Sequence, residues 1–206
     1  MTESVEISPR LERWAEKAGF SSTPARNTED GRAIFWTSSG ELRIFIGIDG
    51  DGLFVVSDSD RMNSEYLVLA APSLETIEKY LYGRFGFALR SDKGLPHLRT
   101  PVLEELGYSC TSQPHKDRER FALVNAAGAL IAIGSADRLT AKVEFKRLAL
   151  MLTASIDEIE SSMMDPDASR CASTSDAGWL IRVGEASCRL GPTNPTIRAR
   201  ARSAPR

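Results

Sequence analysis

The sequence holds few of the residues from which metal sites and disulfide frameworks are built. Among its 206 residues are three widely spaced cysteines, Cys110, Cys171 and Cys188, and two histidines, His97 and His115. Zinc sites need several ligands at short spacing, and disulfide-rich folds need an even, closely spaced set of cysteines. We therefore expect no metal site and no disulfide framework.

Long apolar runs are also missing. No stretch approaches the roughly 18 to 20 apolar residues that a membrane span needs. The first residues, Met1–Glu6, lack the positive and apolar regions of a secretion signal. These absences predict a cytoplasmic protein that has no membrane partner.

Excess positive charge, which nucleic-acid binding requires, is absent from most of the chain. Residues 1–165 carry 19 Lys and Arg against 25 Asp and Glu, whereas residues 166–206 carry 7 Arg against 3 acidic residues. An acidic body argues against nucleic acid as a partner, because binding to phosphates needs a basic face. It suits a protein partner with a basic surface instead.

Apolar periodicity and turn residues predict an α+β fold, with an antiparallel sheet of about six strands and helices on one face. The strands are marked by β-branched or aromatic residues between glycine-bearing turns. They are expected at 32–37, 41–46, 53–57, 65–70, 120–124 and 129–134.

Four helices are predicted from N-cap residues followed by apolar residues at helical spacing. The second begins at Pro72–Ser73, and Gly83 and Gly86 are expected to loosen its last turn. The others are expected at 9–18, 141–152 and 155–164, and 21–31 and 90–101 are expected as loops. Residues 166–206, rich in Ser, Ala and Arg, are predicted to be a disordered tail after a domain at 1–165.

Two acidic motifs invite a chemical interpretation. Asp49–Gly52 resembles the start of a calcium loop, but the apolar residues that follow leave no further oxygen ligands, so a hairpin turn is favoured. Asp58–Arg61 could supply a carboxylate pair for acid–base catalysis, or form a turn with a local ion pair. As a charged loop beside a sheet, it is also a candidate binding surface.

Other candidates for chemistry are weaker. Cys110 and His115 could form a nucleophile pair, although a solvated loop histidine is favoured. An aromatic set, Tyr80, Tyr82 and Phe85, could line a ligand groove or face the core. Residues 83–86 lack the lysine and glycine pattern of a phosphate-binding loop. No catalytic constellation and no cofactor are therefore predicted, and binding is favoured over catalysis.

Several runs resemble a family of actinobacterial, largely mycobacterial, immunity proteins of polymorphic toxin systems. The likeness covers roughly residues 10–166. It is carried by the runs Asp51–Met62, Leu69–Ser73, Glu78–Gly83, Gly94–Pro96, Ser135–Leu139 and Asp157–Glu160. The family is similar to the antitoxin of the tuberculosis necrotizing toxin, an NAD-degrading enzyme.

The resemblance implies a protein that binds a cognate toxin, blocks its active site and has no catalytic residues of its own. On this hypothesis three charged segments contact the toxin, and Arg61 orients the two neighbouring carboxylates of its segment. The expected contacts are Asp49, Asp51, Asp58, Ser59, Asp60, Arg61, Arg90 and Lys93. Two alternatives stay open, a small-molecule binding module with a pocket at Tyr80, Tyr82 and Phe85, and a hydrolase. The resemblance leaves the oligomeric state unknown.

Overall fold

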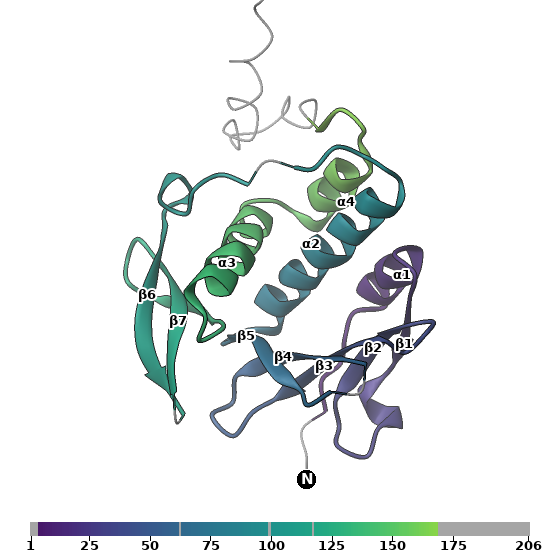
Figure 1. Ribbon diagram of the computed structural model, residues 1–206, viewed down its shortest axis with the longest axis horizontal. Helices are drawn as coiled ribbons and strands as arrows, with labels where there is room; N and C mark the ends of the chain where they lie inside the picture. The colour runs from purple at the N-terminus through teal and green to yellow at the C-terminus, as the bar shows by residue number, and fades with distance from the viewer. Residues whose placement is uncertain (1–3, 62, 99, 117, 169–206) are drawn as a thin grey trace, which may run out of the picture.

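A computed structural model describes residues 4–61, 63–98, 100–116 and 118–168 (Figure 1). The predicted tail at 166–206 falls almost wholly outside this range. Within it the chain forms one sheet covered on one face by four helices, as the sequence predicts (Figure 1). No helix among the described residues is long and apolar enough to cross a membrane.

The sheet has eight antiparallel strands in the order β1-β2-β3-β4-β5-β8-β7-β6. Two meanders, β1–β5 and β6–β8, meet where β5 lies beside β8, and the register there has one pair, Ala70 with Ile133. The strands are β1 (Phe20–Thr23), β2 (Ala33–Thr37), β3 (Leu42–Ile48), β4 (Phe54–Asp60), β5 (Tyr66–Ala71), β6 (Tyr108–His115), β7 (Arg118–Asn125) and β8 (Leu130–Ile133).

The helices begin where the sequence offers a capping side chain. The N-cap residues Ser8, Ser73, Asp137 and Ser155 each accept a hydrogen bond from a backbone N–H of the first turn. At Ser155 the full capping box is present, as predicted. The helices are α1 (Pro9–Lys17), α2 (Leu74–Asp92), α3 (Arg138–Leu152) and α4 (Ile156–Met164), with short 3₁₀ turns η1 (Ala25–Asn27) and η2 (Glu104–Leu106).

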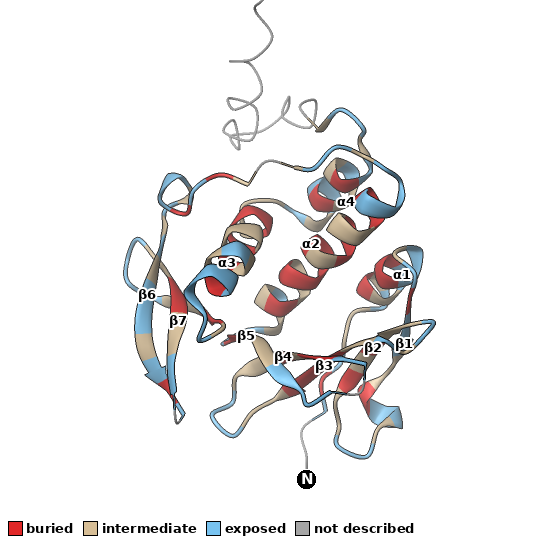
Figure 2. Ribbon diagram, viewed as in Figure 1, coloured by how far each residue is buried: buried red, intermediate tan, exposed pale blue. Residues whose placement is uncertain are grey.

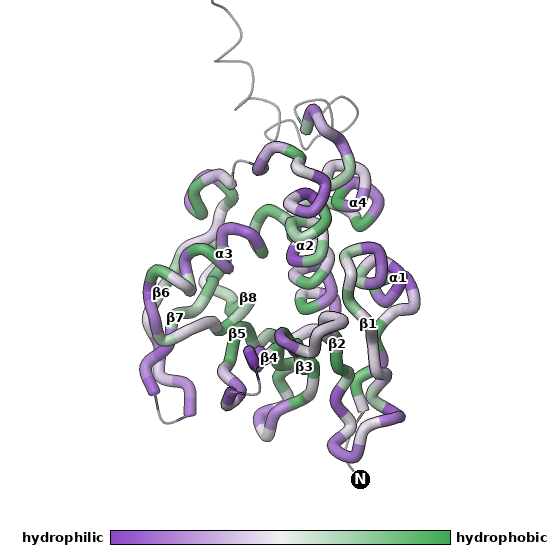
Figure 3. Tube along the Cα trace, turned by 45° about the vertical axis from the view of Figure 1, so that its right-hand side comes forward, coloured by the Kyte–Doolittle hydropathy of each residue, from purple (hydrophilic) through white to green (hydrophobic). Residues whose placement is uncertain are grey.

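The core lies between the helices and the sheet, with α2 at its centre. Figure 2 shows α2 buried along most of its length, and the apolar segments of α2, β5 and β8 lie toward the middle of the molecule in Figure 3. The rings of Phe20 and Phe35 lie 4.9 and 5.1 Å from that of Phe85. Burying these rings anchors α2 on β1 and β2.

Two glycines let the other helices approach α2 closely. A Cβ atom at Gly83 would lie 2.6 Å from Cγ of Met151 in α3, and one at Gly86 would lie 2.4 Å from Cγ of Met163 in α4. Both glycines sit inside the helix rather than in its last turn. Their predicted loosening role is therefore wrong, and their function is close packing.

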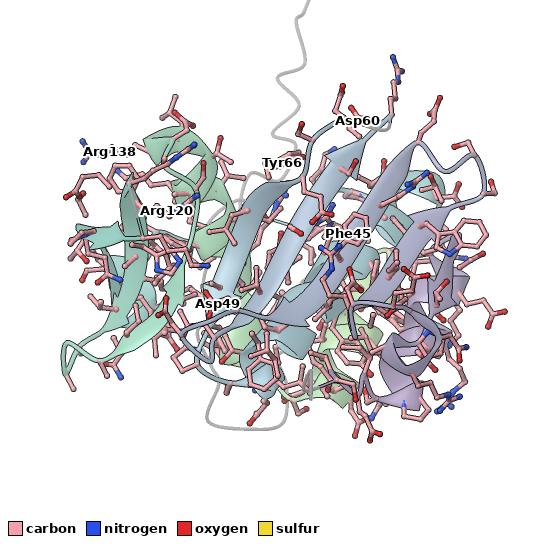
Figure 4. All side chains as sticks on the ribbon, turned by 90° about the horizontal axis from the view of Figure 1, so that it is seen from below. Phe45, Asp49, Asp60, Tyr66, Arg120 and Arg138 are labelled. Carbon is pink, nitrogen blue, oxygen red and sulfur yellow. The ribbon has the colours of Figure 1, made fainter. Side chains whose placement is uncertain are left out.

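The opposite face of the sheet is partly covered by one side chain. Arg32 lies over the ring of Phe45, 4.5 Å from its centroid, and pairs with Asp30 and Glu65 at 2.6 Å each. Figure 4 views the sheet from this side, with Phe45 near its middle. Arg32 therefore shields an aromatic ring that the helices do not cover.

The structure corrects the expected strand count from about six to eight. The two additional strands are β1 and β6, both at the edges of the sheet. The predicted loop 21–31 begins within β1, and the predicted loop 90–101 begins inside α2, which continues to Asp92. The strand expected at 53–57 corresponds to β4, which runs farther than predicted, to Asp60.

Candidate functional site

The two acidic segments, Asp49–Gly52 and Asp58–Arg61, were expected to contact the same partner. They lie at opposite ends of the β3–β4 hairpin. Asp60 pairs with Leu42 at one end, and the Asp49–Gly52 turn connects the strands at the other. Seven residues at about 3.3 Å each separate the two ends by roughly 20 Å. Figure 4 shows Asp49 and Asp60 at these separate positions. The predicted contacts therefore do not form one compact surface.

The Asp49–Gly52 segment is a hairpin turn, as favoured from the sequence. Oδ1 of Asp49 accepts hydrogen bonds from the backbone N–H groups of Asp51 and Leu53, both at 3.0 Å. Its Oδ2 pairs with Nζ of Lys116 at 2.9 Å. Burial tends to raise the pKa of Asp49, but the hydrogen bonds from Lys116 and the backbone outweigh it and lower that pKa. Asp49 thus ties this turn to the β6–β7 turn, while Asp51 stays exposed.

Asp58 and Ser59 were expected on a loop, and that placement is wrong. Both lie in β4 and are 5% exposed. Arg84 of α2 donates to the two carboxylate oxygens of Asp58 at 2.8 and 2.7 Å, and Ser59 donates to the carbonyl of Asn63 at 2.7 Å. The partner of Asp58 is therefore Arg84 rather than Arg61. A carboxylate held by two hydrogen bonds from one guanidinium is poorly placed for acid–base catalysis.

Arg90 was also expected on a loop as a toxin contact, and this placement is wrong. Arg90 lies in α2, is 1% exposed and donates to backbone carbonyls, at distances of 2.6 to 3.2 Å. The acceptors are Pro96, Ser162, Met163 and Asp165. A guanidinium used this way joins α2, the loop after it and the end of α4. Lys93, the residue that caps α2, is exposed.

One pocket opens beside Asp58, between the sheet and the helices α2 and α3. We call it the Tyr66 pocket, after the exposed aromatic residue at its edge. Its volume is about 200 Å³, large enough for one side chain of a partner. It is lined by Asp58, Tyr66, Leu67, Val68, Tyr80, Arg84, Ser135, Thr140, Glu144 and Arg147.

The charges in the Tyr66 pocket are paired with one another. The hydroxyl of Tyr80 donates to Glu144 at 2.9 Å, and Arg147 pairs with the same carboxylate at 3.1 Å. Burial raises the pKa of Tyr80, so this hydroxyl stays protonated and donates. Burial lowers the pKa of Arg84, but Tyr80 and Asp58 outweigh it and raise that pKa. The pocket is thus a fixed array of paired charges.

Three exposed side chains lie at the end of the sheet where the Tyr66 pocket opens. Tyr66 is 55% exposed, and Asp60 and Arg61 are exposed at the same end of the sheet. We call these three residues the Tyr66 rim. Figure 4 shows Tyr66 and Asp60 on neighbouring strands at this end. Sequence reasoning missed Tyr66, because an aromatic residue at the start of a strand is usually buried.

Neither alternative site is assembled. Cys110 and His115 lie on one strand five residues apart, so alternation directs their side chains to opposite faces. The predicted loop position of His115 is wrong, since it ends β6 and is 9% exposed. Burial raises the pKa of the Cys110 thiol, which disfavours the reactive thiolate. Tyr82 and Phe85 are fully buried and line no ligand groove. Within the described ranges, no acidic, His and Cys side chains gather into a metal-binding group.

Comparison with known proteins gives three consistent results. The sequence model of a family described as Immunity protein 61 matches residues 14–169. The "Immunity factor for TNT" of Mycobacterium tuberculosis is 38% identical over 170 residues, which are 81% of this chain and 93% of the relative. The "Immunity factor for TNT homolog" of Mycobacterium bovis matches with the same identity and coverage. The solved structure of Rv3902c from M. tuberculosis matches with a TM-score of 0.70 and 36% identity, covering 82% of this chain and 94% of the other.

Proposed function

The chain belongs to the immunity protein 61 family, and we propose that it neutralises a toxin related to TNT by binding it and covering its active site. The relative that is 38% identical is named as the immunity factor for TNT. The family match over residues 14–169 contains the whole sheet, the helices α2, α3 and α4, and part of α1. The immunity role therefore rests on nearly the whole fold rather than on a short motif.

Inhibition by binding alone agrees with the geometry. Of the two carboxylates that sequence reasoning considered for catalysis, Asp58 is held by Arg84, and Asp60 is exposed at the end of β4. Cys110 and His115 face opposite sides of the sheet. The proposed mechanism needs no bond to be made or broken. It needs only a fixed surface of suitable shape and charge.

The Tyr66 rim is our proposed contact with the toxin. The observation that carries this assignment is the exposed ring of Tyr66 beside a pocket whose charged walls are held rigid by ion pairs. Interfaces concentrate their binding energy in Tyr, Trp and Arg side chains next to pockets, and a fixed surface loses little entropy on binding. Asp60 and Arg61 then supply charges that guide the encounter.

The remaining expected contacts differ in whether their side chains are available to a partner. Asp51 and Lys93 are exposed and remain predictions, each at a distance from the rim. Asp49 is committed to Lys116, and Arg90 is buried, so neither side chain is available to a partner. The proposed complex forms in the cytoplasm of the cell that makes the toxin, because the toxin must be silenced there before it is released.

The test begins with a pull-down of the full chain from its native cell, followed by co-expression with the toxin recovered. The unmodified chain should restore growth and inhibit the purified toxin at one-to-one stoichiometry. The double charge reversal Asp60→Lys and Arg61→Glu should weaken inhibition about tenfold or more, with little change in melting temperature.

The comparison variant is Lys93→Glu, which reverses an exposed charge at the end of α2 that is also still a predicted contact. A chain that recovers no toxin, from cells shown to make one, would exclude the immunity mechanism. Inhibition unchanged by the rim reversal but lost in the Lys93 variant would move the contact surface to the end of α2.

A further inference from the structure

Two neighbouring arginines of β7, Arg118 and Arg120, have no carboxylate partner among the described residues. We call them the arginine pair. They are two positions apart in the strand, so both side chains project to the same face, roughly 7 Å apart. Leu123, of opposite parity in the strand, packs in the core, so the arginine pair faces away from the helices. Figure 4 shows Arg120 on this open face of the sheet.

Three carboxylates of neighbouring segments are committed elsewhere. Asp49 pairs with Lys116 at 2.9 Å. Glu119 projects to the other face of β7, where it accepts a hydrogen bond from the hydroxyl of Ser112 at 2.6 Å. Asp137 is the N-cap of α3. The two positive charges of the arginine pair are therefore not balanced by these carboxylates.

The pKa of Arg120 also differs from that of an arginine with an acidic partner. Hydrogen bonds to Glu160 and Asp157 raise the pKa of Arg10. Burial and the positive charge of Arg118 instead lower the pKa of Arg120. The guanidinium stays protonated at neutral pH, but its surroundings oppose its charge. Ionisable groups in unfavourable surroundings are typical of functional sites, because a ligand of opposite charge relieves the repulsion.

The arginine pair lies close to the proposed toxin contact. The backbone N–H of Phe121, the residue after Arg120, donates to the carbonyl of Ser135 at 3.2 Å. Ser135 lines the Tyr66 pocket together with Tyr66. The guanidinium of Arg120 reaches the carbonyl of Gly134 at 3.4 Å. One residue of the chain, Ser135, thus borders both the Tyr66 pocket and the strand that carries the arginine pair.

We propose that the arginine pair binds an acidic segment of the toxin, one that presents two carboxylates about 7 Å apart. This inference rests on the proposed function and names the chemistry of the toxin surface beside the Tyr66 rim. A guanidinium donates two parallel hydrogen bonds to one carboxylate, so each arginine accommodates one acidic side chain. Acidic residues two positions apart in an extended segment match the spacing of the pair.

The charge of the rest of the chain favours a protein segment over a nucleic acid. Residues 1–165 carry 19 Lys and Arg against 25 Asp and Glu, so their surface repels a polyanion that follows it over a long distance. A short acidic segment meets the two arginines without lying along the acidic surface. Moving that segment off the pair brings it against like charge, so the arginine pair also fixes the orientation of the toxin.

The test is the rate of association between the full chain and the purified toxin, measured by stopped flow at several salt concentrations. The double variant Arg118→Gln with Arg120→Gln should associate about tenfold more slowly at low salt, and its rate should depend less on salt. Its melting temperature should be unchanged or higher, because the variant removes a repulsion between like charges. A purely structural role of these arginines would lower the melting temperature instead.

The matched control is Arg13→Gln with Arg26→Gln, which removes two exposed positive charges from α1 and η1. The control should associate as fast as the unmodified chain. Equal slowing of both double variants would reflect net charge alone and overturns the proposal. Unchanged association of the Arg118 and Arg120 variant also overturns it, and leaves the immunity function standing. An unmodified chain that binds no toxin overturns the proposed function as well.

Lysine variants identify the bound group directly. Arg118→Lys and Arg120→Lys keep the charge and supply an amine, which a carbodiimide joins to a contacting carboxylate as an amide, with loss of water. In the complex each amine should be linked to an Asp or Glu of the toxin, as located by mass spectrometry. A complex that forms normally but gives no such link overturns the proposal. A link to a second copy of this chain would assign the arginine pair to self-association and overturns it too.

Discussion

The guanidinium of Arg84 in α2 donates two hydrogen bonds, at 2.8 and 2.7 Å, to the carboxylate of Asp58 in β4. The two residues are 26 positions apart in the sequence. The pair fixes the central helix on the strand that ends at the Tyr66 rim. Asp58 is 5% exposed, and Arg84 places the opposite charge beside its buried carboxylate. The same contact thus stabilises the fold and supports the proposed binding surface.

Replacing Arg84 with Met should destabilise the protein by about 3 kcal/mol, because it leaves a buried carboxylate without its partner. Chemical denaturation of Arg84→Met would measure this loss. The double variant Asp58→Leu with Arg84→Met should recover much of it, because an apolar pair of similar volume needs no compensating charge. Equal losses in the single and double variants would contradict this account.

Gly86→Ala should destabilise the protein by about 1 to 2 kcal/mol, although alanine normally favours a helix. The added Cβ would lie 2.4 Å from Cγ of Met163, near the backbone of α4. Combining Gly86→Ala with Met163→Ala tests this cause. The two changes should be less destabilising together than their separate effects predict, as measured in a double-mutant cycle.

Asp49→Asn should reduce stability at neutral pH, with an effect that fades in acid. The folded state holds the pKa of Asp49 below its unfolded value, near 3.9. The charge therefore contributes stability above the unfolded pKa, and this contribution is lost as the pH falls through the folded pKa. Melting temperatures measured from pH 7 to pH 2.5 should converge for the two proteins. Asp51→Asn, at an exposed carboxylate in the same turn, is the control.

Tyr66→Ala should weaken toxin binding by about 2 kcal/mol, roughly 30-fold, and leave the melting temperature nearly unchanged. Titration calorimetry with the toxin would measure the affinity. Leu139→Ala provides the comparison, because Leu139 is a 75% exposed apolar residue on α3 outside the rim. If the Leu139 variant loses more affinity than the Tyr66 variant, the contact lies on α3.

Arg90→Met should destabilise the protein by about 3 kcal/mol without a direct effect on toxin binding. The guanidinium is the donor for carbonyls of Pro96, Ser162, Met163 and Asp165, and its loss leaves these groups short of partners. Binding assays well below the melting temperature should give an unchanged affinity. A large loss of affinity in a folded variant would restore Arg90 to the contact surface.

Local signals allowed most of the fold to be predicted. Ser8, Ser73 and Ser155 mark helix starts because the capping side chain acts within three residues of its own position. The edge strand β6 was missed for a physical reason. It lies half in solvent and carries Ser, Thr and Gln, so it lacks the apolar alternation by which a buried strand is identified.

The candidate site was predictable only in part, because its essential pairings join distant parts of the chain. The run Asp58–Arg61 stands out in the sequence, but its first two residues are buried and only Asp60 and Arg61 reach the surface. The spacing of residues in the sequence predicts neither the ion pair between Asp58 and Arg84 nor the exposure of Tyr66. The family resemblance, by contrast, was confirmed by the match over residues 14–169.

The narrow joint between β5 and β8 has a consequence for how the molecule folds and opens. Each meander is built from short turns, so its contacts form between neighbours in sequence, whereas the pair Ala70–Ile133 closes a loop of more than 60 residues. Closing so long a loop lowers the chain's conformational entropy, and a single residue pair between the two strands offsets little of that cost. The amides at this joint should therefore exchange with deuterium sooner than those of β3 and β4. The β6–β8 meander should be the first unit of the sheet to separate.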